Sequence, residues 1–153
     1  MPALSWRSWA LVAGPTGLAV LALASCASET PAVPAETAPA TFTAVYAMMF
    51  PASTNGKCNF CHGLPANNVS NGNLSMGTDK AVAYAALVAK VSSSTACNGR
   101  PLVVAGHPET SLLLAKLFED VDCGSRMPLG GNLFSDEQRQ MVRGWIAAGA
   151  KDN

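Results

Sequence analysis

Apolar residues recur at helical spacing in four stretches of this chain. The first stretch places four side chains on one helix face: Phe42, Val45, Tyr46 and Met49. Pro51 ends that pattern, because proline cannot continue a helix. The second stretch is alanine-rich and runs from Asp79 to about Val91, with Thr78 as its expected N-cap. Both stretches are therefore predicted to be helices.

The third stretch, Glu109 to Phe118, follows Pro108, which suits the first turn of a helix. The fourth opens with a capping box of Ser135 and Gln138 and ends near Gly149. Its apolar face holds Met141, Val142, Trp145 and Ile146. No segment alternates like a strand for long, and the loops 63–77 and 120–134 are rich in Gly, Asn and Ser. The pattern predicts an all-α domain of about four helices with long loops.

A shorter apolar run, from Ala10 to Ala24, precedes this domain and follows a single positive charge at Arg7. It is too short for a typical membrane span, which needs about 20 apolar residues. The run ends in Leu23-Ala24-Ser25-Cys26, which looks like a bacterial lipobox. That likeness implies cleavage before Cys26 and attachment of lipid to its thiol and new amino group. The alternative is a plain secretory signal with a coincidental cysteine.

Both interpretations of the N-terminus predict an exported chain. The lipobox places it on the periplasmic side of a bacterial membrane, anchored by lipid in the inner or the outer membrane. Residues 1–25 are then the signal peptide, and residues 26–41 are the lipidated cysteine and a Pro/Ala-rich tether that cannot form a core. Residues 42–153 remain as a single domain.

The most specific motif of that domain is Cys58-Asn59-Phe60-Cys61-His62. Cys-x-x-Cys-His is typical of covalent haem attachment. Two thiols at this spacing reach the vinyl-derived carbons on one porphyrin edge and form thioethers, and the adjacent imidazole becomes the proximal iron ligand. We therefore expect one haem c on Cys58 and Cys61, with His62 as an axial ligand.

Two other chemistries use Cys-x-x-Cys. A thioredoxin-like redox pair would follow a βαβ pattern, which is not visible before residue 58. A zinc site would need two further ligands at short spacing, whereas His107 and the remaining cysteines are scattered.

The five cysteines can all be assigned. If Cys26 takes lipid and the motif takes haem, Cys97 and Cys123 remain, and such cysteines usually pair in exported proteins. A disulfide there would contribute ~3.5 kcal/mol by the chain-entropy argument. The alternative is two free, buried thiols.

The iron of an electron carrier normally has a second protein ligand, methionine or histidine. Three methionines lie on predicted helices, where methionine usually fills the core: Met48, Met49 and Met141. Met76 is too near the attachment motif to cross the haem easily. Met127 lies in a loop between two helices and is followed by the rigid Pro128, so it is the predicted ligand. His107 is the alternative distal ligand, or simply an exposed residue at a helix start.

The order of motifs makes residues 42–151 resemble class I cytochrome c domains, particularly the small monohaem type of bacterial cytochrome c-like lipoproteins and planctomycete-type cytochromes. The matching elements are Cys58-x-x-Cys61-His62-Gly63, Gly106-x-Pro108-x-x-Ser111-Leu112-Leu113, Cys123-Gly124-x-x-Met127-Pro128, Glu137 and Trp145-Ile146-x-x-Gly149-Ala150. The resemblance implies a class I cytochrome c fold, haem c ligated by His62 and Met127, terminal helices that cross beside the haem, and electron transfer. The extra cysteine pair and the position of His107 depart from many members.

These observations predict a membrane-tethered monohaem cytochrome that passes single electrons between redox proteins outside the cytoplasm and is not itself an enzyme. A role as an accessory subunit of an oxidoreductase stays open. The net charge is zero, and removal of residues 1–25 leaves nine basic and ten acidic residues, so the composition does not favour nucleic-acid binding. The alternative function is a haem-based sensor or ligand-binding lipoprotein with an open or bis-histidine distal site.

Overall fold

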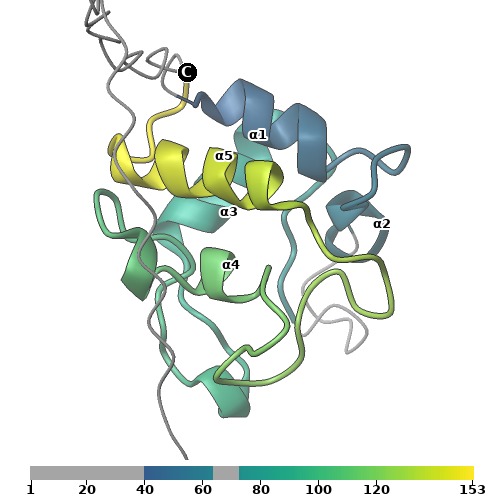
Figure 1. Ribbon diagram of the computed structural model, residues 1–153. Helices are drawn as coiled ribbons and strands as arrows, with labels where there is room; N and C mark the ends of the chain where they lie inside the picture. The colour runs from purple at the N-terminus through teal and green to yellow at the C-terminus, as the bar shows by residue number, and fades with distance from the viewer. Residues whose placement is uncertain (1–39, 64–72) are drawn as a thin grey trace, which may run out of the picture. The chain divides into compact units, whose positions relative to one another are not determined.

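The computed structural model describes residues 40–63 and 73–153, whose regular structure is helical (Figure 1). The α-helices are α1 (Phe42–Met49), α2 (Cys58–His62), α3 (Lys80–Ala89), α4 (Leu112–Ala115) and α5 (Asp136–Ala147), with 3₁₀ turns at Thr95–Cys97 and Pro108–Thr110. Within these ranges the β-structure is one isolated antiparallel bridge, between Val91 and Pro101. The predicted all-α class is confirmed. Cys26 and the predicted signal peptide lie outside the described residues.

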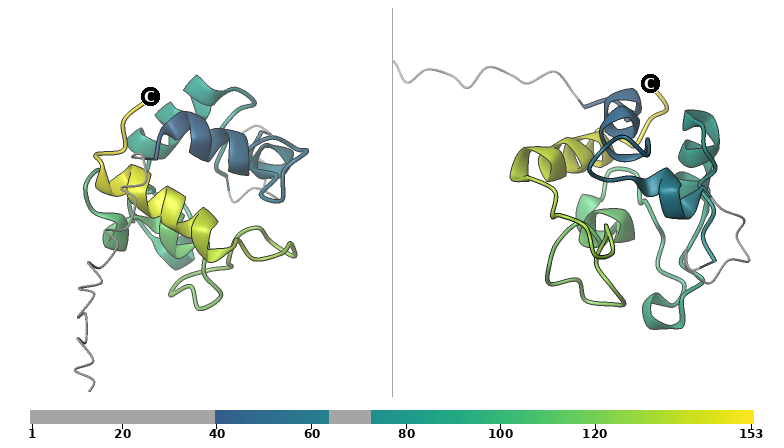
Figure 2. Two further views of the ribbon diagram at one scale, coloured as in Figure 1. Left: turned by 45° about the horizontal axis from the view of Figure 1, so that its top comes forward. Right: turned by 90° about the vertical axis from the view of Figure 1, so that its right-hand side faces the viewer.

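The first and last helices of the domain pack against each other. Helices α1 and α5 lie side by side in all three views (Figures 1 and 2). The ring centroids of Phe42 and Trp145 are 4.9 Å apart, and both side chains are buried. The amide of Thr43 donates to the carbonyl of Asn153 at 2.9 Å, which ties the C-terminus to the start of α1. This helix pair supplies much of the core.

Both terminal helices begin and end as the apolar pattern predicts. In α1, Phe42, Val45 and Met49 are buried. Helix α5 has both halves of the predicted capping box: the Gln138 amide donates to Ser135 Oγ at 3.3 Å, and the Ser135 amide donates to Gln138 Oε1 at 2.8 Å. Local sequence signals suffice here because each helix carries its own cap and its own apolar face.

The predicted bounds of α3 were wrong at both ends. Asp79, rather than Thr78, is the N-cap, because its carboxylate accepts a hydrogen bond from the Val82 amide at 3.0 Å. The helix ends at Ala89 instead of Val91. Lys90 is extended, and its carbonyl accepts from the Leu102 amide at 3.1 Å, so a long-range backbone contact ends the helix.

The single helix predicted over 109–118 was also wrong. The chain forms a 3₁₀ turn at Pro108–Thr110, becomes extended at Ser111 with φ −79° and ψ 118°, and then forms the short α4. Pro108 does occupy the first turn, as predicted.

Long-range hydrogen bonds explain this break. The amides of Leu112 and Leu113 donate to the carbonyls of Pro101 and Leu102, at 3.1 and 2.8 Å, instead of to the preceding turn. The buried Ser111 Oγ accepts from the Val104 amide at 2.8 Å. Because these partners are distant in sequence or are backbone atoms, the apolar pattern alone could not reveal them.

Candidate functional site

A cavity of about 940 Å³ brings together four of the predicted site residues: Cys58, Cys61, His62 and Met127. Its volume is at the upper end of the range typical of small-molecule and cofactor sites. The lining comes from α2, from residues 73–76 and 90–94, from α4 and from the loop 124–132. Buried apolar side chains form much of the inner wall, among them Leu87, Leu112 and Leu117. The cavity therefore offers an apolar enclosure with thiol, imidazole and thioether groups on its walls.

The attachment motif forms α2, which is held close to α1. At Gly56, an added Cβ would lie 2.4 Å from the carbonyl oxygen of Met49, so only glycine permits this approach. The Asn59 amide donates to the carbonyl of Phe50 at 2.9 Å. Lys57, at the N-cap of α2, adopts a left-handed conformation with φ 48°. Backbone packing therefore places α2 at the cavity wall.

The imidazole of His62 is oriented by a backbone carbonyl. Its Nδ1 atom lies 3.0 Å from the carbonyl oxygen of Leu74. A carbonyl can only accept, so Nδ1 carries the proton of this contact, and in the neutral ring the lone pair then lies on Nε2. The Met76 amide donates to the His62 carbonyl at 2.6 Å, which keeps the 74–76 segment beside α2. A metal-binding histidine is typically oriented in this way.

The two motif cysteines are free thiols in different environments. Cys58 is half-buried and Cys61 is exposed. Burial raises the pKa of the Cys58 thiol to about 12; a backbone hydrogen bond opposes this shift and the nearby Cys61 adds to it. Thioredoxin-like pairs have the opposite property, a thiol whose pKa is lowered. The environment of Cys58 thus disfavours a thiol-redox role.

Met127 lies on the cavity wall and is half-buried. Its amide donates to the carbonyl of Lys116 at 2.7 Å, at the end of α4. Met49 and Met76 also line the cavity, but both are buried in the core cluster, and the Met76 amide is bonded to the carbonyl of His62. Met48 and Met141 pack against that core and do not line the cavity.

His107 is not brought to this site. Its side chain is 66% exposed, and its Nδ1 atom lies 3.4 Å from Glu109 Oε1. It is a described residue that does not line the cavity. The geometry thus favours Met127 over His107 as a group that faces the attachment motif.

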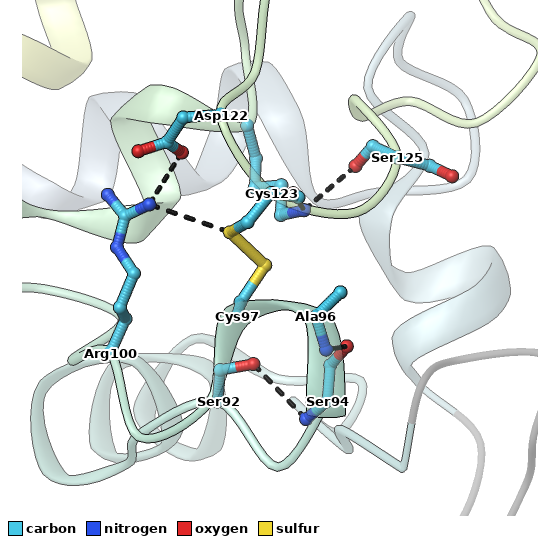
Figure 3. The surroundings of a disulfide bond; sticks show 9 residues. Ser92, Ser94, Ala96, Cys97, Arg100, Asp122, Cys123 and Ser125 are labelled. Carbon is cyan, nitrogen blue, oxygen red and sulfur yellow. Dashed lines mark hydrogen bonds and ion pairs between the residues drawn. A yellow bond between two sulfur atoms is a disulfide. The ribbon is translucent and has the colours of Figure 1, made fainter.

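The remaining cysteines, Cys97 and Cys123, are joined in a disulfide, with their Cα atoms 5.3 Å apart (Figure 3). Arg100 points toward this bond: Nη1 donates to Cys123 Sγ at 3.5 Å and pairs with Asp122 Oδ1 at 2.5 Å. This hydrogen bond from Arg100 is the main reason that the pKa of Asp122 is lowered. Because Cys123 lies at the start of the loop that carries Met127, the disulfide anchors that end of the loop.

Two contributors to the site were not predicted. The carbonyl of Leu74 belongs to the backbone, and no residue type signals that it would face His62. Lys116, which lines the cavity and donates to loop carbonyls, was part of a predicted helix and had no distinguishing pattern. Burial lowers the pKa of its ammonium group, against the attraction of Asp122.

Comparison with protein-family models, with curated proteins and with solved structures finds no match to this chain. Within residues 40–63 and 73–153, no three His, Cys, Asp or Glu side chains gather where they could hold a metal ion. The helices of the same residues include none with the length and apolar character needed to span a membrane. A functional assignment therefore rests on the residues and geometry of the cavity.

Proposed function

We propose that this protein is a membrane-tethered monohaem c-type cytochrome of the class I kind. In this proposal it carries single electrons between redox proteins outside the cytoplasm. The observation that carries the proposal is the orientation of His62, whose Nδ1 atom faces the Leu74 carbonyl 3.0 Å away. Nε2 is thereby left as a ligand, beside two cysteines at haem-attachment spacing and on the wall of a cavity of about 940 Å³.

Four of the cavity residues have a role in this proposal. Cys58 and Cys61 would hold the haem through thioethers, His62 would bind the iron through Nε2, and Met127 would supply the second protein ligand through its sulfur. When bound, the haem supplies the one-electron ferrous/ferric couple. A single histidine and a single methionine suffice as protein ligands, so a cluster of three acidic, cysteine or histidine ligands is not needed. The thioether ligand favours a higher reduction potential than a second imidazole would.

The cavity wall protects this chemistry from water. Leu87, Leu112 and Leu117 are each no more than 3% exposed. Because ligands held by a packed wall need not rearrange when the charge of the iron changes, such a site suits outer-sphere electron transfer better than substrate turnover. We infer a carrier, alone or as an accessory subunit of an oxidoreductase.

The proposal places the domain at a bacterial membrane through lipid on Cys26 and the tether that follows it. The mature chain carries nine basic and ten acidic residues, so a strong charge does not steer its partners. We therefore propose docking to redox proteins through apolar contacts beside Cys58 and Cys61, where Phe60 is 72% exposed.

The decisive experiment is production of the full chain in a bacterial host with a c-type haem maturation system. We expect haem staining on a denaturing gel and a pyridine haemochrome spectrum of thioether-linked haem. A double variant, Cys58→Ser with Cys61→Ser, should lose the stain. The control Phe60→Ala alters the exposed position between the cysteines and should keep it. Wild-type protein without covalent haem would overturn the proposal.

A further inference from the structure

The loop that carries Met127 is bound by two cationic side chains, one on each side of the methionine. Before it, Lys116 Nζ donates to the carbonyls of Cys123 and Ser125, the latter at 3.0 Å. After it, the Arg126 guanidinium donates to the Pro128 carbonyl at 3.2 Å and twice to the Gly131 carbonyl, both at 3.1 Å. The loop has no helix or strand of its own, so these bonds replace regular backbone pairing.

Lys116 connects this loop to the core. It is the C-cap of α4, whose Leu112 and Leu114 are buried. Its own carbonyl accepts the Met127 amide at 2.7 Å, so one residue binds the loop through both its backbone and its side chain. Gly124 leaves room for the ammonium group, since a Cβ there would lie 3.0 Å from Lys116 Nζ.

Arg126 acts on the other half of the loop. Its bonds to the carbonyls of Pro128 and Gly131 close the turn that follows Met127. Charge-assisted hydrogen bonds are stronger than neutral ones, and a planar guanidinium can hold two carbonyls in a fixed geometry. The backbone on both sides of Met127 is therefore restrained by a cation.

We propose that Lys116 and Arg126 are positioning residues that hold Met127 at the cavity as the axial ligand. The inference rests on the proposed His62/Met127 ligation and deepens it. Loss of either cation would free part of the loop, so the methionine sulfur would be held less firmly as a ligand of the proposed haem. A small external ligand then binds in its place more readily.

A general stabilising role would not produce that effect. Lys80 provides the comparison, because it lies outside the cavity lining and donates to Asp152 Oδ1 at 2.7 Å and to Thr43 Oγ1 at 3.3 Å, away from the Met127 loop. A substitution that weakens only the fold should lower the free energy of unfolding and leave the affinity for imidazole unchanged. Imidazole titration of the ferric holoprotein measures that affinity directly.

The test compares wild type with Lys116→Met, Arg126→Met and the control Lys80→Met, all as full-chain holoprotein. We expect the first two variants to bind imidazole at a concentration lower by about tenfold or more, as loss of charge-assisted hydrogen bonds to the loop implies. Their far-red charge-transfer band, which reports the methionine–iron bond, should fade at lower temperature. Lys80→Met should match wild type in imidazole affinity.

Equal imidazole affinity in wild type and all three variants would overturn the inference while leaving the proposed function intact. Wild type with covalent haem but no far-red band would overturn Met127 ligation and the inference with it, whereas absence of covalent haem overturns the proposed function itself. If Lys116→Met does not accumulate as holoprotein, Lys116→Gln replaces it, with the same expected result and the same contrary one.

Discussion

The carbonyl oxygen of Leu74 lies 3.0 Å from Nδ1 of His62. Between the two residues lies a segment outside the described ranges. The Met76 amide donates to the His62 carbonyl at 2.6 Å and holds the 74–76 segment against α2. The contact determines the tautomer and the direction of the imidazole, because a carbonyl accepts and cannot donate. Histidines that bind metals are typically oriented by such a contact, so the restraint supports the proposed ligation through Nε2.

The two histidines of the chain should respond differently to substitution. His62→Ala removes the proposed proximal ligand, so we expect a low yield of holoprotein and an altered visible spectrum in what remains. His107→Ala is the matched control, because that side chain is 66% exposed and lies outside the cavity lining. Visible absorption and haem content per polypeptide measure both. An altered ligand-field spectrum in His107→Ala would instead favour bis-histidine ligation.

Met127→Ala should open the distal side of the haem. We expect loss of the far-red charge-transfer band, a lower reduction potential and binding of carbon monoxide by the reduced protein without denaturation. Met141→Leu is the control, because Met141 packs against the core on α5. Carbon monoxide binding by the wild-type protein would contradict closed His/Met ligation and favour a sensor or ligand-binding function.

The disulfide should contribute strongly to the stability of this small domain. Cys97 and Cys123 are 26 residues apart, so opening the bond enlarges the conformational freedom of the unfolded chain. Replacing both with serine should lower the free energy of unfolding by about 2–4 kcal/mol. Denaturant titration with and without reductant measures this loss. The double variant should no longer respond to reductant, and a wild-type protein that is equally stable in reductant would contradict the prediction.

The ion pair of Arg100 and Asp122 should make a small, pH-dependent contribution. The Arg100 hydrogen bond holds the folded-state pKa of Asp122 below its ordinary value of 3.8. The contribution is therefore present above that value and is lost as pH falls through the lower folded-state pKa. The stability difference between wild type and Asp122→Asn should shrink below about pH 4. Urea unfolding at pH 6 and pH 2.5 measures it, with Asp120→Asn, an exposed neighbour, as the control.

Part of the fold followed directly from local patterns. The apolar spacing and caps predicted α1 and α5 with their buried faces, since those signals act within a few residues. The helix predicted over 109–118 failed because the amides of Leu112 and Leu113 bond to Pro101 and Leu102. The helix after Asp79 ended early for a similar reason, at Lys90. Non-local backbone bonds outweighed local propensity in both places.

In the candidate site, too, the sequence predicted one part and the packing of distant segments decided the other. Residue types and spacing alone singled out Cys58, Cys61, His62 and Met127, because covalent haem attachment depends on the order of thiols and imidazole along the chain. Their roles as haem ligands stay predictions. That these four side chains line one cavity, and that His107 does not, depended on how distant segments pack.

The sequence by itself determined the chemical groups of this protein: a Cys-x-x-Cys-His motif, a loop methionine, two further cysteines and the caps of its terminal helices. Only the tertiary structure decided how those groups are held. It placed the Leu74 carbonyl on His62 and the Lys116 ammonium on the Met127 loop. The physical reason is that both contacts involve backbone carbonyls, which every residue carries alike, so their partners are chosen by packing rather than by residue type.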